Sequence, residues 1–245
     1  MNTNTLRKLW QDSFGDTEDF LDSFFATAYH PDRCRCITDS GKILGALYWF
    51  DCLYQGESLA YLYAIATHPS YRNQGICRRL MQETHQHLAQ QGYLGTLLVP
   101  GNKTLFDFYK KMGYQTCSTV SEFTCESSST SIAITEITKD QYAEIRHQYL
   151  PINSVIQEKE NLDFLQTQAH LYRGDNFLLA AHKDTNRLWG MELLGDTTTA
   201  PDILYTLDCT NGTFRIPGEE IPFAMYYPLT DRKISPPNYF GLAFD

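Results

Sequence analysis

Residues 60–81 read AYLYAIATHPSYRNQGICRRLM. Their apolar first part predicts a β-strand, His68-Pro69 predicts a turn, and the sequence after Gly75 predicts a helix. A helix that begins directly after a glycine-containing loop presents exposed backbone N–H groups, and Arg72 and Arg78 lie beside them in the sequence. Such N–H groups and arginines bind anionic phosphate groups. The stretch therefore predicts a phosphate site at a strand–loop–helix junction.

The spacing Arg-x-x-Gly-x-small within this stretch also arises by chance. An ordinary strand–loop–helix connection in an α/β protein is the alternative interpretation. A motif of this kind gains weight only from its structural context. Here the apolar strand, the His-Pro turn and the immediate helix are all present, which favours the phosphate site.

Arg72, Gly75 and Cys77 resemble the acyl-CoA-binding motif of the GNAT family of N-acetyltransferases. The family usually has Gly or Ala where this chain has Cys77, and Cys is still small enough for the backbone to approach a pyrophosphate. Residues 101–114, GNKTLFDFYKKMGY, look like the second recurring segment of the family, in which Asn precedes an aromatic-Tyr pair and a Gly-aromatic pair. The resemblance covers roughly residues 6–126.

The resemblance implies an α/β (α+β) GNAT fold, with a mixed central sheet flanked by helices. Periodicity and turn signals along the first half predict elements in a compatible order. They are two helices within residues 6–25 that break at residues 15–17, strands at 35–39, 43–53 and 59–67, a helix at 75–91, a strand at 93–99, a helix at 102–112 and two strands within 114–124.

The polar segment ESSSTS at residues 126–131 predicts a domain boundary, with a catalytic domain at 1–126 and an accessory domain at 132–245. The second half predicts a strand at 132–137, helices at 139–149 and 161–172, and strands at 176–181, 188–194 and 203–209, followed by Pro-rich extended sequence.

This order repeats the opening half of a GNAT unit, but no second Arg-x-x-Gly-x-Gly follows. We therefore expect a degenerate GNAT-like half that lacks the CoA motif, and a sterol-carrier-like or unrelated α+β domain is the alternative. The tandem arrangement and the segment YAIATHP at residues 63–69 resemble the Eis-like acetyltransferases.

The phosphate argument and the resemblance together assign the cofactor site. The backbone of residues 72–78 would hold the pyrophosphate, and the backbone of residues 65–67 would contact the pantetheine arm and polarise the thioester carbonyl. By resemblance, Asn102 contacts the CoA arm, acetyl-CoA is the cosubstrate and no metal takes part. The predicted cofactor-binding residues are Ile65, Ala66, Thr67, Arg72, Asn73, Gln74, Gly75, Ile76, Cys77, Arg78 and Asn102.

Tyr109 occupies the position at which GNAT enzymes often place a general-acid tyrosine that protonates the departing sulfur. The alternative is that Tyr109 belongs to an apolar core stripe with the neighbouring Leu105, Phe108 and Met112.

The base that accepts the amine proton has several candidates. In Eis-like enzymes the C-terminal carboxylate of the chain enters the active site, and this resemblance predicts that Asp245 lies near Tyr109 and takes the proton. The alternative is that the apolar segment 239–244 completes the sheet of the second domain. Glu57, Asp51, His68 and water are the other candidates.

Composition excludes several function classes. The net charge of −9 argues against a nucleic-acid partner, and no apolar run approaches the ~20 residues that span a bilayer. The N-terminus has no apolar signal-peptide core, so cytoplasmic residence is expected.

The cysteines and histidines offer no metal motif. The seven cysteines include no Cys-x-x-Cys pair, which argues against a zinc ribbon or thioredoxin-like chemistry. Cys34 and Cys36 share one face of a predicted strand, which is typical of packing. His85 and His87 are two apart on a predicted helix and face different ways.

The sequence thus predicts an acetyl-CoA-dependent N-acetyltransferase that moves an acetyl group to a primary amine by direct attack in a ternary complex. The acceptor would be a small amine, a peptide N-terminus or a lysine, with no nucleic-acid or membrane partner, and a homo-oligomer is compatible with these features. The alternatives are a non-catalytic acyl-CoA-binding sensor and a protein-interaction module.

Overall fold

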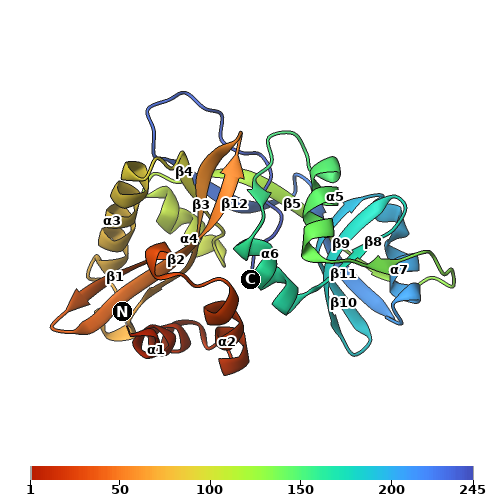
Figure 1. Ribbon diagram of the computed structural model, residues 1–245, viewed down its shortest axis with the longest axis horizontal. Helices are drawn as coiled ribbons and strands as arrows, with labels where there is room; N and C mark the ends of the chain where they lie inside the picture. Colours follow the sequence, from red (N-terminus) through yellow and green to blue (C-terminus); the bar gives the residue numbers. More distant parts are fainter. Residues whose placement is uncertain (1, 245) are drawn as a thin grey trace. The chain divides into compact units, whose positions relative to one another are not determined.

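The computed structural model describes residues 2–244, which form two compact units. Unit 1 contains the chain up to Gln115 together with Met225–Pro236, and unit 2 contains Thr116–Ala224 together with the segment from Pro237 onward. Figure 1 shows the helices and strands of both units, coloured along the sequence.

Unit 1 begins with two helices and continues as a sheet with strand order β1-β2-β3-β4-β12. The β3 and β4 strands are parallel and α3 connects them, whereas the other neighbouring strands are antiparallel. The elements are α1 (Thr3–Phe14), α2 (Glu18–Thr27), β1 (Cys34–Asp39), β2 (Lys42–Tyr54), β3 (Glu57–Thr67), α3 (Ile76–Gln90), β4 (Gly95–Leu98) and α4 (Lys103–Lys110), with 3₁₀ turns at Pro31–Arg33 and Pro69–Tyr71.

These elements confirm the sequence prediction for the first half up to residue 112. The two N-terminal helices separate at Gly15, whose φ of 78° is favourable for glycine, and the Thr17 side chain caps α2 by accepting from the N–H of Phe20.

Unit 2 has the strand order β5-β11-β10-β9-β8-β6, with the first part of β12 beside β5. The β9 and β10 strands form an antiparallel hairpin, and β10 and β11 are parallel with α7 between them. In unit 1 as well, an antiparallel strand pair is followed by a helix and then by a parallel strand. Because unit 2 repeats this order, the second half is GNAT-like. The elements are β5 (Gln115–Glu126), β6 (Thr135–Glu136), α5 (Lys139–Tyr149), β7 (Ile156–Gln157), α6 (Glu160–Gln168), β8 (His170–Arg173), β9 (Phe177–Asp184), β10 (Arg187–Gly195), a 3₁₀ turn at Thr197–Thr199, α7 (Ala200–Thr206), β11 (Asn211–Pro217) and β12 (Ile221–Pro228).

The compact units do not follow the predicted boundaries 1–126 and 132–245. The β5 strand precedes the polar segment but pairs with β11, from Glu126 opposite Asn211 to Val120 opposite Pro217, and so belongs to unit 2. In return, Met225–Pro228 of β12 pairs with β4 and belongs to unit 1. Each unit therefore takes a strand from the other half of the sequence. The assignment of 1–126 as catalytic and 132–245 as accessory stays a prediction.

Several elements predicted beyond residue 112 are wrong. Residues 203–209 are not a strand, because α7 buries Ala200, Ile203 and Leu204 at helical spacing. The helix predicted to reach residue 172 ends at Gln168, and β8 follows. The two strands predicted within 114–124 are one strand, β5. The strand predicted at 132–137 is reduced to Thr135–Glu136, and the Pro-rich sequence holds β11 and β12.

A buried polar chain ties α3 to the sheet of unit 1. The His85 Nε2 atom is 2.8 Å from the Tyr114 hydroxyl, which is 2.7 Å from the Thr96 hydroxyl. The imidazole also stacks on Tyr227, with 4.3 Å between the ring centroids. Burial lowers the pKa of His85 to about 4, so its ring is neutral at pH 7.

The buried ion pair of Arg146 and Glu192 organises unit 2. The Arg146 guanidinium donates to both carboxylate oxygens at 2.6 and 2.8 Å, and the hydroxyls of Tyr142 and Tyr239 each donate to the carboxylate at 2.9 Å. Both charged side chains are buried, so their hydrogen bonds replace water that neither can reach. The pair joins α5, β10 and the C-terminal segment.

The C-terminal segment of the chain docks into unit 2 as extended chain rather than as a sheet strand. The Gln157 amide donates to the carbonyl of Leu242 at 2.6 Å and accepts from its N–H at 3.2 Å. Phe244 is buried and packs edge-on against Phe164. Asp245, the predicted base, lies outside the described residues.

None of the helices between residues 2 and 244 has the length and apolar content to cross a membrane.

We expect His85 to destabilise the protein in acid. The pKa of His85 is lower in the folded state than the 6.5 of a free histidine. Its contribution to the free energy of unfolding is therefore complete above pH 6.5 and declines as the pH falls towards 4. The loss should reach about 3 kcal/mol of unfolding free energy at pH 4. Urea unfolding at pH 7 and pH 4 measures this loss. The His85→Gln variant is the control, because it has no imidazole to take up a proton. Parallel pH dependences for the two proteins would contradict the assignment.

Arg146→Ala should lower the free energy of unfolding by about 3–5 kcal/mol, because it leaves the Glu192 carboxylate buried without its counter-charge. Tyr142→Phe removes one hydrogen bond to the same carboxylate and should cost about 1 kcal/mol. Urea unfolding of both variants tests this order. An Arg146→Ala protein as stable as Tyr142→Phe would show that the ion pair does not anchor unit 2.

Candidate functional site

The turn after β3 is built by His68. Its backbone N–H donates to the carbonyl of Leu44 at 2.9 Å, and its Nδ1 atom accepts from the N–H of Ser70 at 3.2 Å. The ring is thus engaged in capping the 3₁₀ turn Pro69–Tyr71. We conclude that His68 shapes the loop, and its candidacy as the base loses support.

The first turn of α3 is open to an anion. Gly75 stands at the N-cap with φ 79° and ψ 0°, and no side chain caps the helix. The first N–H groups of any helix, here those of Ile76, Cys77 and Arg78, have no partner within the helix. The helix dipole adds a partial positive charge at the same place. The φ of 79° also explains why glycine is needed, since side chains rarely adopt it.

The predicted pyrophosphate residues 72–78 lie together in this loop and first turn. Arg72 and Arg78 are both exposed, and the Arg72 Nε atom donates to the carbonyl of Thr67 at 3.3 Å. Asn73 also has a positive φ, of 61°. The loop therefore offers two arginines and a row of N–H groups to one ligand.

In the equivalent loop of unit 2, a carboxylate caps the 3₁₀ turn that precedes α7. Asp196 follows Gly195 and accepts from the N–H of Thr198 at 3.0 Å and from its hydroxyl at 2.6 Å. These bonds hold the pKa of Asp196 below its usual value. The Asp196 carboxylate thus occupies one N–H group of this loop, that of Thr198, and places a negative charge before α7, whose own N-terminus has no side-chain cap.

Before the loop, the β3 strand bulges against β2 and separates from β4. Ala46 pairs with Ala66 and Tyr48 pairs with Tyr63, so β3 has one extra residue there, and Ala64 has a φ of 46°. The parallel pairing of β3 with β4 covers only Leu59–Tyr61, although β3 continues to Thr67. The β4-facing backbone groups of residues 65–67 lie outside that ladder, as a pantetheine arm would require.

Tyr109 lies on α4, with 6% of its surface exposed, and packs edge-on against Phe108 and Tyr114. Its hydroxyl has no hydrogen-bond partner within residues 2–244. Burial, and then the Cys77 thiol, raise the pKa of Tyr109. Tyr109 belongs to the hydrophobic cluster against which Ile76 and Cys77 of α3 pack, so α4 lies close to the first turn of α3. Burial also raises the pKa of Cys77 to about 11. Tyr109 is therefore a protonated phenol near the loop that precedes α3. It is also part of the hydrophobic core of unit 1.

The Asn102 side chain caps α4 by accepting from the N–H of Leu105 at 3.1 Å. Its role in contacting the CoA arm stays a prediction.

Two carboxylates proposed as the base have other partners. Glu57 accepts two bonds of 2.7 Å from Arg232, which lowers its pKa. It begins β3, about 33 Å of extended strand from Thr67. Asp51 accepts from the Tyr93 hydroxyl at 2.5 Å and from Arg33 at 3.3 Å. Arg232 and Tyr93 carry no sequence signal for these contacts.

The family comparison agrees with this geometry. Residues 2–117 match the family model described as the acetyltransferase (GNAT) domain. This part of the chain belongs to the GNAT family. GNAT domains use acetyl-CoA as cosubstrate, and the family as a whole performs acetyl transfer.

Solved GNAT-type structures share the fold at low sequence identity. A probable N-acyltransferase from Enterococcus faecalis V583 is 16% identical with a TM-score of 0.68, covering 92% of this chain and 70% of that chain. Eis1 from Mycobacterium abscessus is 11% identical with a TM-score of 0.64, covering 90% and 65%. A tandem GNAT protein from the clavulanic acid biosynthesis pathway is 10% identical with a TM-score of 0.56, covering 94% and 96%. No curated protein sequence matches the chain.

Gly75→Asp should weaken acetyl-CoA binding by about tenfold or more, because its carboxylate would repel the pyrophosphate at the helix N-terminus. Gly75→Asn has nearly the same shape, tolerates a positive φ and carries no charge. It should therefore lose much less affinity. Calorimetric titration of both variants with acetyl-CoA measures the difference. Equal affinities for the two would place the phosphates elsewhere.

Proposed function

We propose that this protein is an acetyl-CoA-dependent N-acetyltransferase, with its cofactor site at the start of α3. The observation that carries the proposal is the uncapped N-terminus of α3 directly after a strand that separates from its neighbour. The GNAT match of residues 2–117 supports acetyl transfer in general, and the transfer to an amine is our extension of it.

In this mechanism residues 72–78 hold the pyrophosphate, and the backbone of residues 65–67 lies along the pantetheine arm. The ordered cofactor converts attack by the amine into an effectively unimolecular step, which is the main source of acceleration. A neutral primary amine attacks the thioester carbonyl carbon in a ternary complex, and the carbon–sulfur bond breaks. An N–H group of β3 stabilises the carbonyl oxygen as negative charge develops.

Tyr109 then protonates the departing CoA thiolate. Its raised pKa keeps the phenol protonated near neutral pH, as a donor must be, and its hydroxyl is not committed to another group within residues 2–244. We retain the C-terminal carboxylate of Asp245 and water as the candidates for the proton acceptor.

The acceptor is proposed as a small amine or a peptide amine. The net charge of −9 would favour the approach of cationic molecules, which most amines are at pH 7. Thiol release from acetyl-CoA in the presence of polyamines, amino sugars and N-terminal or lysine peptides tests this class. Turnover with any of them supports the enzyme. Acetyl-CoA binding without turnover would favour the acyl-CoA sensor, and no binding would favour the interaction module.

Tyr109→Phe should lower kcat by about 100-fold or more, because it removes only the oxygen that donates the proton. The KM for acetyl-CoA should change little, since the ring and its packing remain. Phe108→Leu, a substitution at the exposed neighbour, serves as the matched control and should keep its turnover. A Tyr109→Phe enzyme with full turnover would assign Tyr109 to the core alone.

A further inference from the structure

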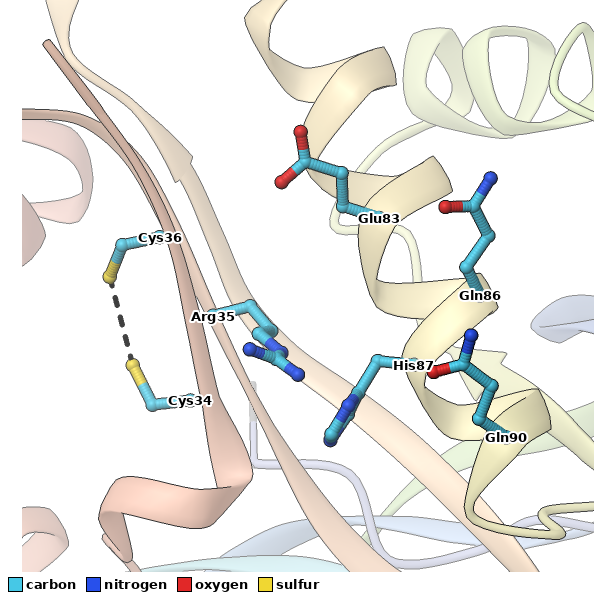
Figure 2. Close-up of a pocket in the computed structure, with 7 residues that line it drawn as sticks. All are labelled: Cys34, Arg35, Cys36, Glu83, Gln86, His87 and Gln90. Atoms are coloured by element: carbon cyan, nitrogen blue, oxygen red, sulfur yellow. Dashed lines mark hydrogen bonds between the residues drawn. The ribbon is translucent and has the colours of Figure 1, made fainter.

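Two thiols lie in contact on β1, outside the proposed acetyl-transfer site. Cys34 and Cys36 are two residues apart on the strand, and their Sγ atoms are 3.9 Å apart. Figure 2 shows both sulfur atoms on one side of the strand, pointing toward each other, whereas Arg35 points to the other side, toward α3. All seven cysteines are thiols. The contact gives this pair a reactivity that an isolated thiol lacks.

The two thiols have different surroundings. Cys34 is 6% exposed, whereas Cys36 is only partly buried. The hydrogen bond from Cys34 lowers the pKa of Cys36, while the same bond and burial raise the pKa of Cys34. Of the two thiols, Cys36 is therefore the one that loses its proton more readily. A partly exposed thiolate beside a second thiol is the arrangement found at oxidation-sensitive cysteines.

The strand geometry allows the two sulfurs to join. Residues two apart in a strand span about 6.6 Å, at the long end of the Cα separations that disulfides bridge. The β1 strand pairs with β2, and its register shifts between Ile37 and Thr38, directly after the pair. A hollow of about 330 Å³ borders β1 beside Arg35.

We propose that Cys36 is an oxidation site for hydroperoxides and that Cys34 is its resolving thiol. The Cys36 thiolate attacks the peroxide, the O–O bond breaks, and the remaining oxygen leaves with a proton as water or an alcohol. The product is a sulfenic acid at Cys36. The Cys34 sulfur then attacks the Cys36 sulfur, the S–O bond breaks, and the hydroxide leaves as water with the proton from Cys34. Two thiols are oxidised to one disulfide, and the peroxide is reduced.

Peptide mapping of the full-length protein after treatment with hydrogen peroxide tests this proposal. Trypsin cleaves after Arg33, Arg35 and Lys42, so it separates Cys34 from Cys36 unless a disulfide joins them. We expect the dipeptide Cys34-Arg35 to remain linked to the peptide 36–42, and dithiothreitol to release it. Peroxide treatment that leaves these two peptides separate, with other cysteines oxidised first, would overturn the proposal.

Two variants assign the roles. In Cys34→Ser the sulfenic acid at Cys36 has no resolving thiol, and dimedone should trap it at Cys36. In Cys36→Ser neither the disulfide nor a dimedone adduct at Cys34 should form. Cys125→Ser is the matched control, since Cys125 is a partly buried thiol in unit 2, and it should form the linked peptide as the wild type does. Dimedone labelling of Cys34 instead of Cys36 would reverse the assignment. The wild-type map decides the matter even where a variant does not fold.

Discussion

The proposed chemistry depends on one backbone constraint, the positive φ of Gly75 at the start of α3. Because no side chain caps this helix, its first N–H groups and the helix dipole remain available to an anion. The end of β3 and the turn after it position this loop. The pairing of β3 with β4 ends at Tyr61, before the bulge at Ala64, and His68 fixes the turn that brings the loop back to the helix.

Comparison of the two halves shows that the capacity to bind an anion depends little on the fold itself. Both units contain an antiparallel pair followed by a helix and a parallel strand, yet the loop of unit 1 carries two exposed arginines and the loop of unit 2 carries Asp196, which accepts from Thr198. The acidic residue of the second loop takes up one N–H group and adds a negative charge that would repel a phosphate. Function therefore follows from the loop residues and not from the architecture they share.

The sequence predicts local features well and distant pairings poorly. The break between the first two helices, the helix after Gly75 and the exact span of α5 follow from signals within a few residues. The pairing of β5 with β11 and of β12 with β4 joins segments far apart in the chain, and no local pattern encodes it. The segment 203–209 is short and apolar, so its periodicity does not separate strand from helix.

In the candidate site, too, the sequence predicts the local features and misses those that depend on distant packing. The grouping of residues 72–78 follows from their adjacency in the sequence and is observed in the loop. The bulge at Ala64 has no glycine to mark it, and the burial of Tyr109 beside Cys77 depends on the packing of α4 on α3. The pairing of Glu57 with Arg232 likewise requires the return of the chain to unit 1, and it removes a carboxylate that sequence alone keeps as a candidate base.

Amide hydrogen exchange with and without acetyl-CoA tests the central claim most directly, because it reports on the backbone N–H groups themselves. The account predicts that acetyl-CoA slows exchange in residues 65–78 and leaves residues 195–206 of the second half unchanged. Unchanged exchange in residues 65–78 at saturating acetyl-CoA, or protection of residues 195–206 instead, would contradict it.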